Sequence, residues 1–138
     1  MKTVSLLQVT KTRDSKVTVH KNVYQRNVRL IHLHFSNFPP GGNTESTFGP
    51  EYLLNNDVVL VAVNYRLGPL GFLATKDGAA TGNFGLKDQI LALKWVQKNI
   101  AVFGGDPDNV TLMGEDSGAA SATIHVLSPE AKGLFHKV

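Results

Sequence analysis

The sequence predicts an α/β fold in which crossover helices connect the strands of a parallel sheet. Residues 58–63 form a continuous, mostly β-branched apolar run, typical of a strand covered on both faces. Apolar residues then recur at steps of three and four between 86 and 103, the spacing of an amphipathic helix. A second apolar strand follows at 110–113, and the order strand, helix, strand indicates a right-handed parallel crossover.

The residues before this apolar run show shorter patterns. Alternating apolar residues predict strands at 4–9 and 17–24, within an amino-terminal stretch, 1–27, that is otherwise polar and mixed. An apolar segment at 28–35 predicts a buried strand, which stops at a loop rich in Asn, Pro and Gly, 38–43. The sequence thus predicts three strands ahead of the apolar run.

The residues after the apolar run alternate between loops and helices. Residues 64–85 are dense in Gly and Pro, which predicts a loop that wanders over the surface. The amphipathic helix ends at Gly104-Gly105, and a proline follows soon after. A tight turn from Gly114 to Gly118 then leads into a last helix, and no terminal strand is expected to close the sheet beyond it.

Composition narrows the functional classes. The chain has 138 residues, 42% of them hydrophobic and 18% charged, which is ordinary for one globular domain. It has no Cys, which excludes a disulfide scaffold, a thiolate zinc site and a cysteine nucleophile. The net charge of +3 is scattered, so nucleic acid is not an expected partner. The longest apolar run is far too short to span a membrane.

Several blocks of residues between 48 and 138 are specific in composition and order. They are Tyr52-Leu53-Leu54, Asp57-Val58-Val59-Leu60-Val61, Asn64-Tyr65-Arg66-Leu67-Gly68-Pro69-Leu70-Gly71-Phe72-Leu73, Gly82-Asn83-Phe84-Gly85-Leu86-Lys87-Asp88-Gln89, Leu93-Lys94-Trp95-Val96, Asn99-Ile100, Phe103-Gly104-Gly105-Asp106-Pro107, Asn109-Val110-Thr111-Leu112 and Lys132-Gly133-Leu134-Phe135-His136. With these blocks the chain resembles the type-B carboxylesterases, the α/β-hydrolase family that includes cholinesterases and insect detoxification esterases. The resemblance implies that residues 1–138 are a partial α/β-hydrolase domain, the half that carries the nucleophile elbow. It also implies a small ester as substrate, a serine nucleophile, no metal and no cofactor.

The elbow of the family is Gly-Glu-Ser-Ala-Gly, in which two glycines let a sharp strand-to-helix turn close. The corresponding residues here are Gly114-Glu115-Asp116-Ser117-Gly118. Because the glycine spacing is intact, Asp116 occupies the nucleophile position. Ser117 then falls on the position whose backbone NH contributes to the oxyanion hole. Glu115 is expected to be a buried carboxylate with a structural partner.

The oxyanion loop is a second departure from the family pattern. Members follow the strand ending near His32 with His-Gly-Gly-Gly, since backbone NH groups approach an oxyanion only where side chains are absent. His32 matches the histidine of that motif, but Leu33 and His34 stand where glycines belong. Gly41-Gly42 come later and are expected to be turn residues. His32 and His34 share one face of a strand, but with no third ligand at useful spacing we predict no metal site.

The catalytic acid and base form a third departure. In this fold they follow the nucleophile along the chain, and only His125 and His136 follow Asp116. His125 lies about two turns into the helix and cannot return to its start. His136 belongs to a structural block of the family. The sequence therefore predicts an ester-hydrolase relative that is inactive or nearly so.

Two other functions stay open. Cholinesterase-like adhesion proteins lack the catalytic Ser, so a non-catalytic binding or adhesion homologue is the alternative. An Asp-nucleophile hydrolase acting at saturated carbon is the third possibility, although such elbows resemble Gly-x-Asp-Trp-Gly and no Trp follows Asp116.

The remaining polar and aromatic residues of the motifs have structural interpretations. Trp95 is expected to pack on a helix face. Loop-pinning hydrogen bonds are expected from four polar residues, which are Asn64, Arg66, Asp88 and Asp106.

The strands at 58–63 and 110–113 are predicted to be buried on both faces. Without a carboxyl-terminal half, the sheet would then expose an unpaired apolar edge. We expect low solubility, or dependence on the missing half or on a protein partner. The compartment stays open, since no signal peptide is visible and family members are often secreted.

Overall fold

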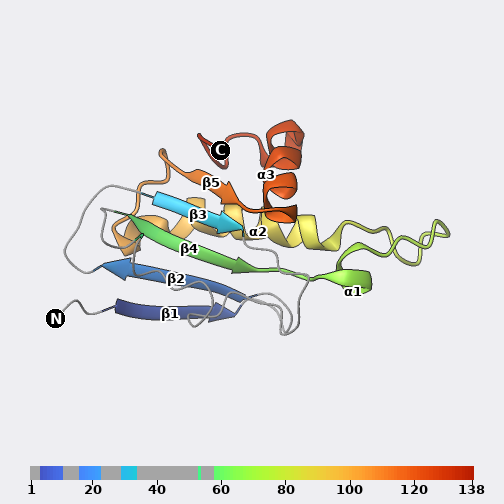
Figure 1. Ribbon diagram of the computed structural model, residues 1–138, viewed down its shortest axis with the longest axis horizontal. Coiled ribbons are helices and arrows are strands. Elements are labelled where there is room, and N and C mark those ends of the chain that lie inside the picture. Colours follow the sequence, from blue (N-terminus) through green and yellow to red (C-terminus); the bar gives the residue numbers. More distant parts are fainter. Residues whose placement is uncertain (1–3, 11–15, 23–28, 34–52, 54–57) are drawn as a thin grey trace.

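The computed structural model describes residues 4–10, 16–22, 29–33, 53 and 58–138 (Figure 1). The described residues form a sheet of five strands in the order β1-β2-β4-β3-β5. The strands are β1 (Val4–Thr10), β2 (Lys16–Asn22), β3 (Arg29–Leu33), β4 (Val59–Asn64) and β5 (Thr111–Gly114). The strands predicted before residue 58 are thus confirmed where they are described, whereas the predicted loop at 38–43 lies outside the described residues.

The sheet has a parallel half and an antiparallel half. β3 pairs in parallel with both β4 and β5, and it lies between them (Figure 1). β1 and β2 extend the sheet beyond β4 through antiparallel pairs. The predicted parallel sheet is confirmed for its last three strands, because the helical connection from β4 to β5 returns the chain in the same direction.

The helices are α1 (Gly68–Phe72), α2 (Phe84–Asn99), the 3₁₀ turn η2 (Ile100–Phe103), α3 (Ser117–Leu127) and the 3₁₀ turn η3 (Pro129–Ala131). The predicted helix at 86–103 is confirmed as α2 and η2, and Gly104 ends it with a φ of 75°. The prediction of a continuous loop at 64–85 is wrong, because α1 forms there. Pro69 lies in the first turn of α1, where a missing NH breaks no helical hydrogen bond.

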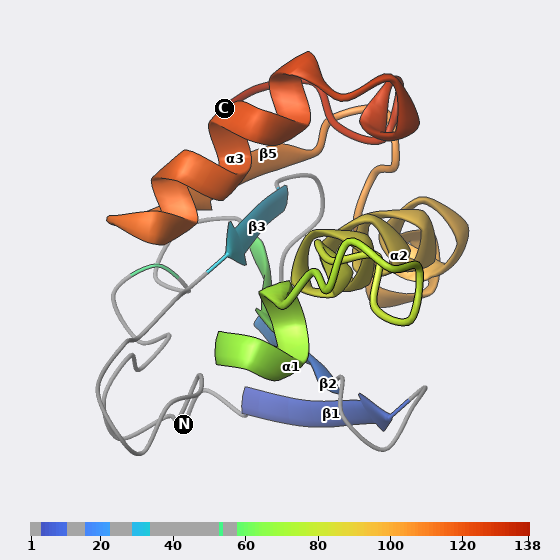
Figure 2. The same ribbon diagram turned by 90° about the vertical axis from the view of Figure 1, so that its right-hand side faces the viewer.

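The core lies between β4 and the two long helices. Every residue of β4 except Asn64 is buried, so the predicted burial on both faces is confirmed. The alternate residues Val59, Val61 and Val63 share one cluster with Leu93 of α2 and with Ala122 of α3. In Figure 2, α3 lies at the opposite end of the sheet from β1.

The edge strand β5 is less buried than expected. Only Leu112 of this strand is buried, so the predicted burial of 110–113 on both faces is wrong for β5. The carboxyl-terminal segment also covers part of its edge, since Thr111 forms a parallel bridge with Lys137 and the NH of Leu112 donates to the Lys137 carbonyl at 2.8 Å. As predicted, no terminal strand follows α3 in the described chain, and the isolated bridge covers only part of the edge. Figure 1 shows the carboxyl terminus beside β5.

Candidate functional site

The turn between β5 and α3 is strained at Asp116. This residue has φ 53° and ψ −119°, a combination that side-chain-bearing residues rarely adopt. Among the described residues, only Lys76 and Asn83 share its positive φ without being glycine. The side chain of Asp116 is exposed, directly before the first turn of α3. The turn therefore presents the Asp116 carboxylate at the carboxyl end of the parallel strands.

Two glycines make this turn possible. A Cβ on Gly114 would overlap the carbonyl carbon and oxygen of Gly118, so strand and helix meet backbone to backbone. The NH of Gly118 donates to the Glu115 carbonyl at 2.8 Å, and the NH of Ala120 donates to the Asp116 carbonyl at 3.1 Å. A tight turn is thus bonded directly onto the start of α3, which forces Asp116 into its unusual conformation.

β3 brings the predicted oxyanion strand beside this turn. His32 lies opposite Met113 and Leu33 lies opposite Gly114 in the parallel ladder between β3 and β5. β3 therefore ends next to the elbow. Residues 34–52, which include His34 and Gly41-Gly42, lie outside the described residues.

The neighbours of Asp116 have contrasting environments. Glu115 is exposed, so the expectation of a buried structural carboxylate is wrong; the described chain leaves the elbow open at the sheet edge. The hydroxyl oxygen of Ser117 is buried and has no hydrogen-bond partner among the described residues. Ser117 is also the first residue of α3, so its NH is one of the amino-terminal groups that a helix leaves unpaired. A negative charge is favoured beside such groups by about 0.3–1 kcal/mol.

The two histidines that follow the elbow are engaged elsewhere. His125 is 1% exposed, and its Nε2 lies 2.7 Å from the side-chain oxygen of Gln89. It lies nine positions after Asp116, which corresponds to about 13 Å along the helix. Burial lowers the pKa of His125. The Nδ1 of His136 accepts the NH of Val110 at 3.1 Å. Neither imidazole lies at the elbow.

A buried polar cluster around His125 was missed by the sequence interpretation. The side-chain nitrogen of Gln89, which is fully buried, donates to the Ser121 hydroxyl at 3.4 Å. Tyr65 lies in the same cluster, and burial raises its pKa to about 12. The sequence did contain a signal for this cluster, because the polar residue Gln89 lies on the apolar face of its helix. The cluster joins α2 to α3.

The loop after β4 is fixed by an ion pair. The Arg66 guanidinium donates two hydrogen bonds to the carboxylate of Asp88, each of 2.8 Å, and it stacks 5.0 Å from the centre of the Phe84 ring. The predicted loop-pinning role of Arg66 and Asp88 is confirmed. The predicted packing of Trp95 is confirmed as well, since its ring lies 5.8 Å from that of Phe103.

Within the part of the chain that the structure describes, no three His, Asp or Glu residues are arranged to hold a metal ion. The helices of that part are all too short or too polar to cross a bilayer.

The parallel strands, the strained turn and the two glycines define the α/β-hydrolase class. Comparison with known proteins gives the family. The model of the carboxylesterase family matches residues 20–138, so this chain belongs to that family.

The relatives include insect esterases. The chain is 52% identical over 109 residues to esterase E4 of Myzus persicae and 47% identical over 108 residues to juvenile hormone esterase of Tribolium castaneum. Each alignment covers 78% of this chain but only 19% and 18% of the relative. The solved juvenile hormone esterase from Manduca sexta, with OTFP covalently attached, is 41% identical with a TM-score of 0.80, over 86% of this chain and 23% of that one. The chain thus spans about a fifth of the length of the relatives it matches.

Proposed function

We propose that this chain carries the nucleophile-elbow part of a carboxylic ester hydrolase whose nucleophile position is occupied by Asp116. As it stands, the chain hydrolyses esters very slowly or not at all. The observation that supports this is the conformation of Asp116, which combines an exposed side chain with φ 53° and ψ −119° between β5 and α3. A small ester is the substrate class that the family implies for a whole enzyme.

The chemistry of a carboxylate explains the proposed loss of activity. Attack by the Asp116 carboxylate on an ester carbonyl would give an anhydride, which is itself reactive. The negative charge would also oppose the oxyanion that, in this proposal, the NH of Ser117 would bind. His125 and His136, both bonded elsewhere, supply no base. The chain therefore lacks an effective acyl-transfer nucleophile, a stabilised oxyanion and a base for proton transfer.

A chimera tests the nucleophile separately from the missing base. Residues 58–138 replace the matching segment of the Manduca sexta esterase, which then supplies the oxyanion loop and all later residues. We expect hydrolysis of p-nitrophenyl acetate to be about 10⁴-fold slower with Asp116 than with Asp116→Ser, since loss of a triad nucleophile costs at least that much.

The matched control is Ser117→Ala in the Asp116→Ser chimera, which keeps the backbone NH and should keep the activity. Rates within tenfold for the Asp116 and Asp116→Ser chimeras would refute the proposal. In the 138-residue chain itself, Asp116→Ser alone should not create activity, because the base is still absent.

The exposed carboxylate favours one second candidate, an Asp-nucleophile hydrolase acting at saturated carbon. Such an enzyme displaces halide from a haloalkane and leaves an alkyl ester on Asp116. Incubation of the Asp116 chimera with 1-bromobutane, digestion and mass analysis would reveal the added butyl group on the peptide that holds residue 116. The base supplied by the chimera could hydrolyse this ester, so only an unmodified peptide together with no release of bromide would exclude the candidate.

The complete transcript separates the remaining alternatives. A Ser codon at position 116 followed by a downstream acid and His would identify a serine esterase and contradict the proposal. A confirmed Asp codon followed by a membrane-spanning segment would favour an adhesion homologue instead.

A further inference from the structure

One sequence pattern near the elbow has no part in the proposed chemistry. Asn109-Val110-Thr111 has the form Asn-x-Thr with a middle residue other than proline, which is the acceptor pattern for an N-linked oligosaccharide. None of the other asparagines of the chain is followed two positions later by Ser or Thr. A glycan linked through asparagine would therefore be attached at Asn109.

Asn109 lies in a turn ahead of β5 and not in the strand, which begins at Thr111. The NH of Asn109 donates to the Asp106 carbonyl at 3.2 Å, and the NH of Asp108 donates to the Asp106 carboxylate at 2.8 Å. Val110 is fully buried, whereas Asn109 and Thr111 on either side of it are partly exposed. The two residues that define the pattern therefore both reach the surface.

The side-chain amide of Asn109 is held by its oxygen and not by its nitrogen. Lys137 Nζ donates to Asn109 Oδ1 at 3.0 Å. The Nδ2 of Asn109 makes no hydrogen bond to any residue that the structure describes. A sugar attaches to this nitrogen and leaves the oxygen as an acceptor, so the hydrogen bond from Lys137 can persist in the modified protein.

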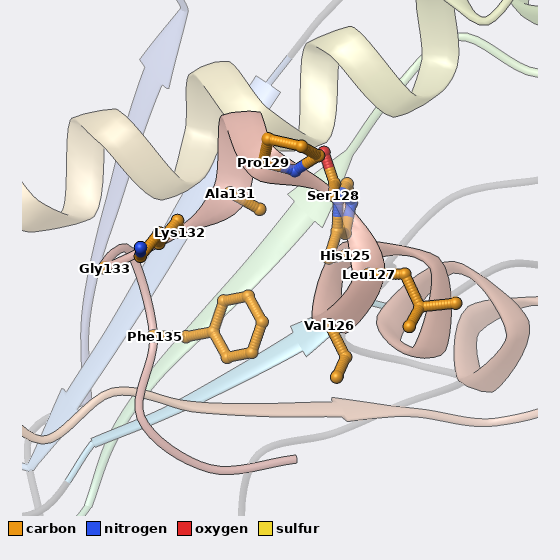
Figure 3. A pocket seen from close by; sticks show the side chains of 9 residues that line it. All are labelled: His125, Val126, Leu127, Ser128, Pro129, Ala131, Lys132, Gly133 and Phe135. Atoms are coloured by element: carbon orange, nitrogen blue, oxygen red, sulfur yellow. The ribbon is translucent and has the colours of Figure 1, made fainter.

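The segment that carries Lys137 is itself fixed beside the turn. Figure 3 shows the Phe135 ring pointing toward α3 from the segment that follows η3, and this ring packs against the core. The NH of His136 donates to the Val110 carbonyl at 2.8 Å. Asn109 is thus held in one orientation from two directions, by its own turn and by the carboxyl-terminal segment.

A glycan on Asn109 would lie away from the elbow. Asn109 precedes β5 and Asp116 follows it, and the four residues of β5 span about 10 Å. In Figure 1, β5 runs from the turn that holds Asn109 toward the start of α3. A bulky, hydrated oligosaccharide at Asn109 would therefore leave the Asp116 carboxylate accessible.

We infer that Asn109 is a modification site and that the folded chain carries an N-linked oligosaccharide there, added as the chain enters the secretory pathway. The donor is a lipid-diphosphate-linked oligosaccharide. A bond forms between Asn109 Nδ2 and C1 of the first sugar, while the bond from C1 to the diphosphate oxygen breaks. The lipid diphosphate leaves with the electron pair, and the nitrogen gives one of its two protons to a base of the transferring enzyme.

Expression behind a cleavable secretion signal tests the inference. The 138-residue chain is made in insect cells, and molecules from which the signal has been removed are scored in cells and medium together. We expect a band of higher mass that N-glycosidase F returns to the mass of the bare chain. In oxygen-18 water, this treatment converts the modified asparagine into a labelled aspartate, and peptide mass then locates it.

Two matched variants remove the acceptor pattern. Asn109→Gln keeps an amide, and Thr111→Val keeps the shape of a side chain whose hydroxyl makes no hydrogen bond to a described residue. We expect both variants to lose the heavier band. An unmodified Asn109 in signal-free chains would overturn the inference, and so would a heavier band that persists in either variant.

Melting temperature tests whether the folded chain accommodates the glycan. In the chimera with the Manduca sexta esterase, the parent and Thr111→Val differ by the glycan at Asn109, and we expect them to melt at the same temperature. The control pair is Ala101→Thr and Ala101→Val, of which only the first creates the acceptor pattern at Asn99. The Nδ2 of Asn99 donates to the Trp95 carbonyl at 2.7 Å, so a sugar there would crowd the helix and lower the melting temperature.

An equal loss of melting temperature in the two pairs would overturn the inference that the folded chain carries the glycan at Asn109. The inference does not depend on the chemistry of Asp116. Ester hydrolysis in the Asp116→Ser chimera tests the proposed function separately, and we expect its rate to be the same with and without the glycan.

Discussion

Replacing Asp116 with Gly should stabilise the fold while it removes the elbow side chain. The φ and ψ values of Asp116 carry a strain of about 1–3 kcal/mol, which glycine avoids. Against this, glycine costs about 0.4–1 kcal/mol in unfolded-state entropy, and the favourable carboxylate at the start of α3 is lost, about 0.3–1 kcal/mol. The free energy of unfolding should therefore rise by about 1 kcal/mol.

Urea unfolding provides the assay. Trp95 is the single tryptophan and packs with Phe103 against the core, so its fluorescence reports on the loss of packing. We would use Leu127→Lys as the background to limit association, and expect a midpoint higher by roughly 0.5 M urea.

The control for this prediction is Asp108→Gly. Asp108 is exposed and is absent from the described residues with positive φ, so glycine relieves no strain there. We expect Asp108→Gly to lower the midpoint. If Asp116→Gly lowers it equally, the strain argument is refuted and the elbow is relaxed.

Three further perturbations test other parts of the structure. Gly114→Ala should destabilise by 2 kcal/mol or more, because its methyl group overlaps backbone atoms of Gly118; the urea midpoint of the variant checks this. Asp88→Asn should cost about 1.5–3 kcal/mol, because the partly exposed Arg66 guanidinium loses a charged hydrogen-bond partner, and circular dichroism would show early melting. Burial lowers the pKa of His125, so its contribution to stability is complete above about pH 6.5 and is lost as the pH falls through the lowered value. The loss is at most about 1.4 kcal/mol per pH unit, and His125→Gln, compared at pH 7.5 and 5, should be less sensitive to acid.

The sequence was most informative where local pattern and burial agree. The β-branched run of β4 is buried on both faces, and the spacing of apolar residues in α2 gave its buried side. The prediction of a continuous loop at 64–85 was wrong because its glycines and proline are equally compatible with a turn and with the start of a short helix. Gly71 is buried, and a Cβ at this position would overlap the Arg66 carbonyl, a close approach that the pattern of apolar residues does not record.

The errors at the sheet edge and at Glu115 have a common physical origin. The bridge between Thr111 and Lys137 joins residues 26 positions apart, and no periodicity records such a pairing. The exposure of Glu115 depends on which distant residues pack against the elbow, and this is likewise a property of the tertiary structure. The spacing of Gly114 and Gly118, by contrast, is local, and it predicted a turn whose strained residue is Asp116.

The shape of the elbow is independent of the residue at its tip. The contact of Gly114 with Gly118 and the hydrogen bonds at the start of α3 impose the turn, so Ser or Asp at position 116 must adopt the same backbone conformation. Selection for the fold alone would favour Gly at position 116, since a strained side chain is favoured only where it has a function that offsets the strain. The strained, exposed carboxylate of Asp116 is therefore the feature that most needs a chemical test. The incubation with 1-bromobutane tests its reactivity, and the Asp116→Gly measurement tests its cost in stability. A trapped ester would give Asp116 a task; gained stability without one would mark it as the remnant of a serine elbow.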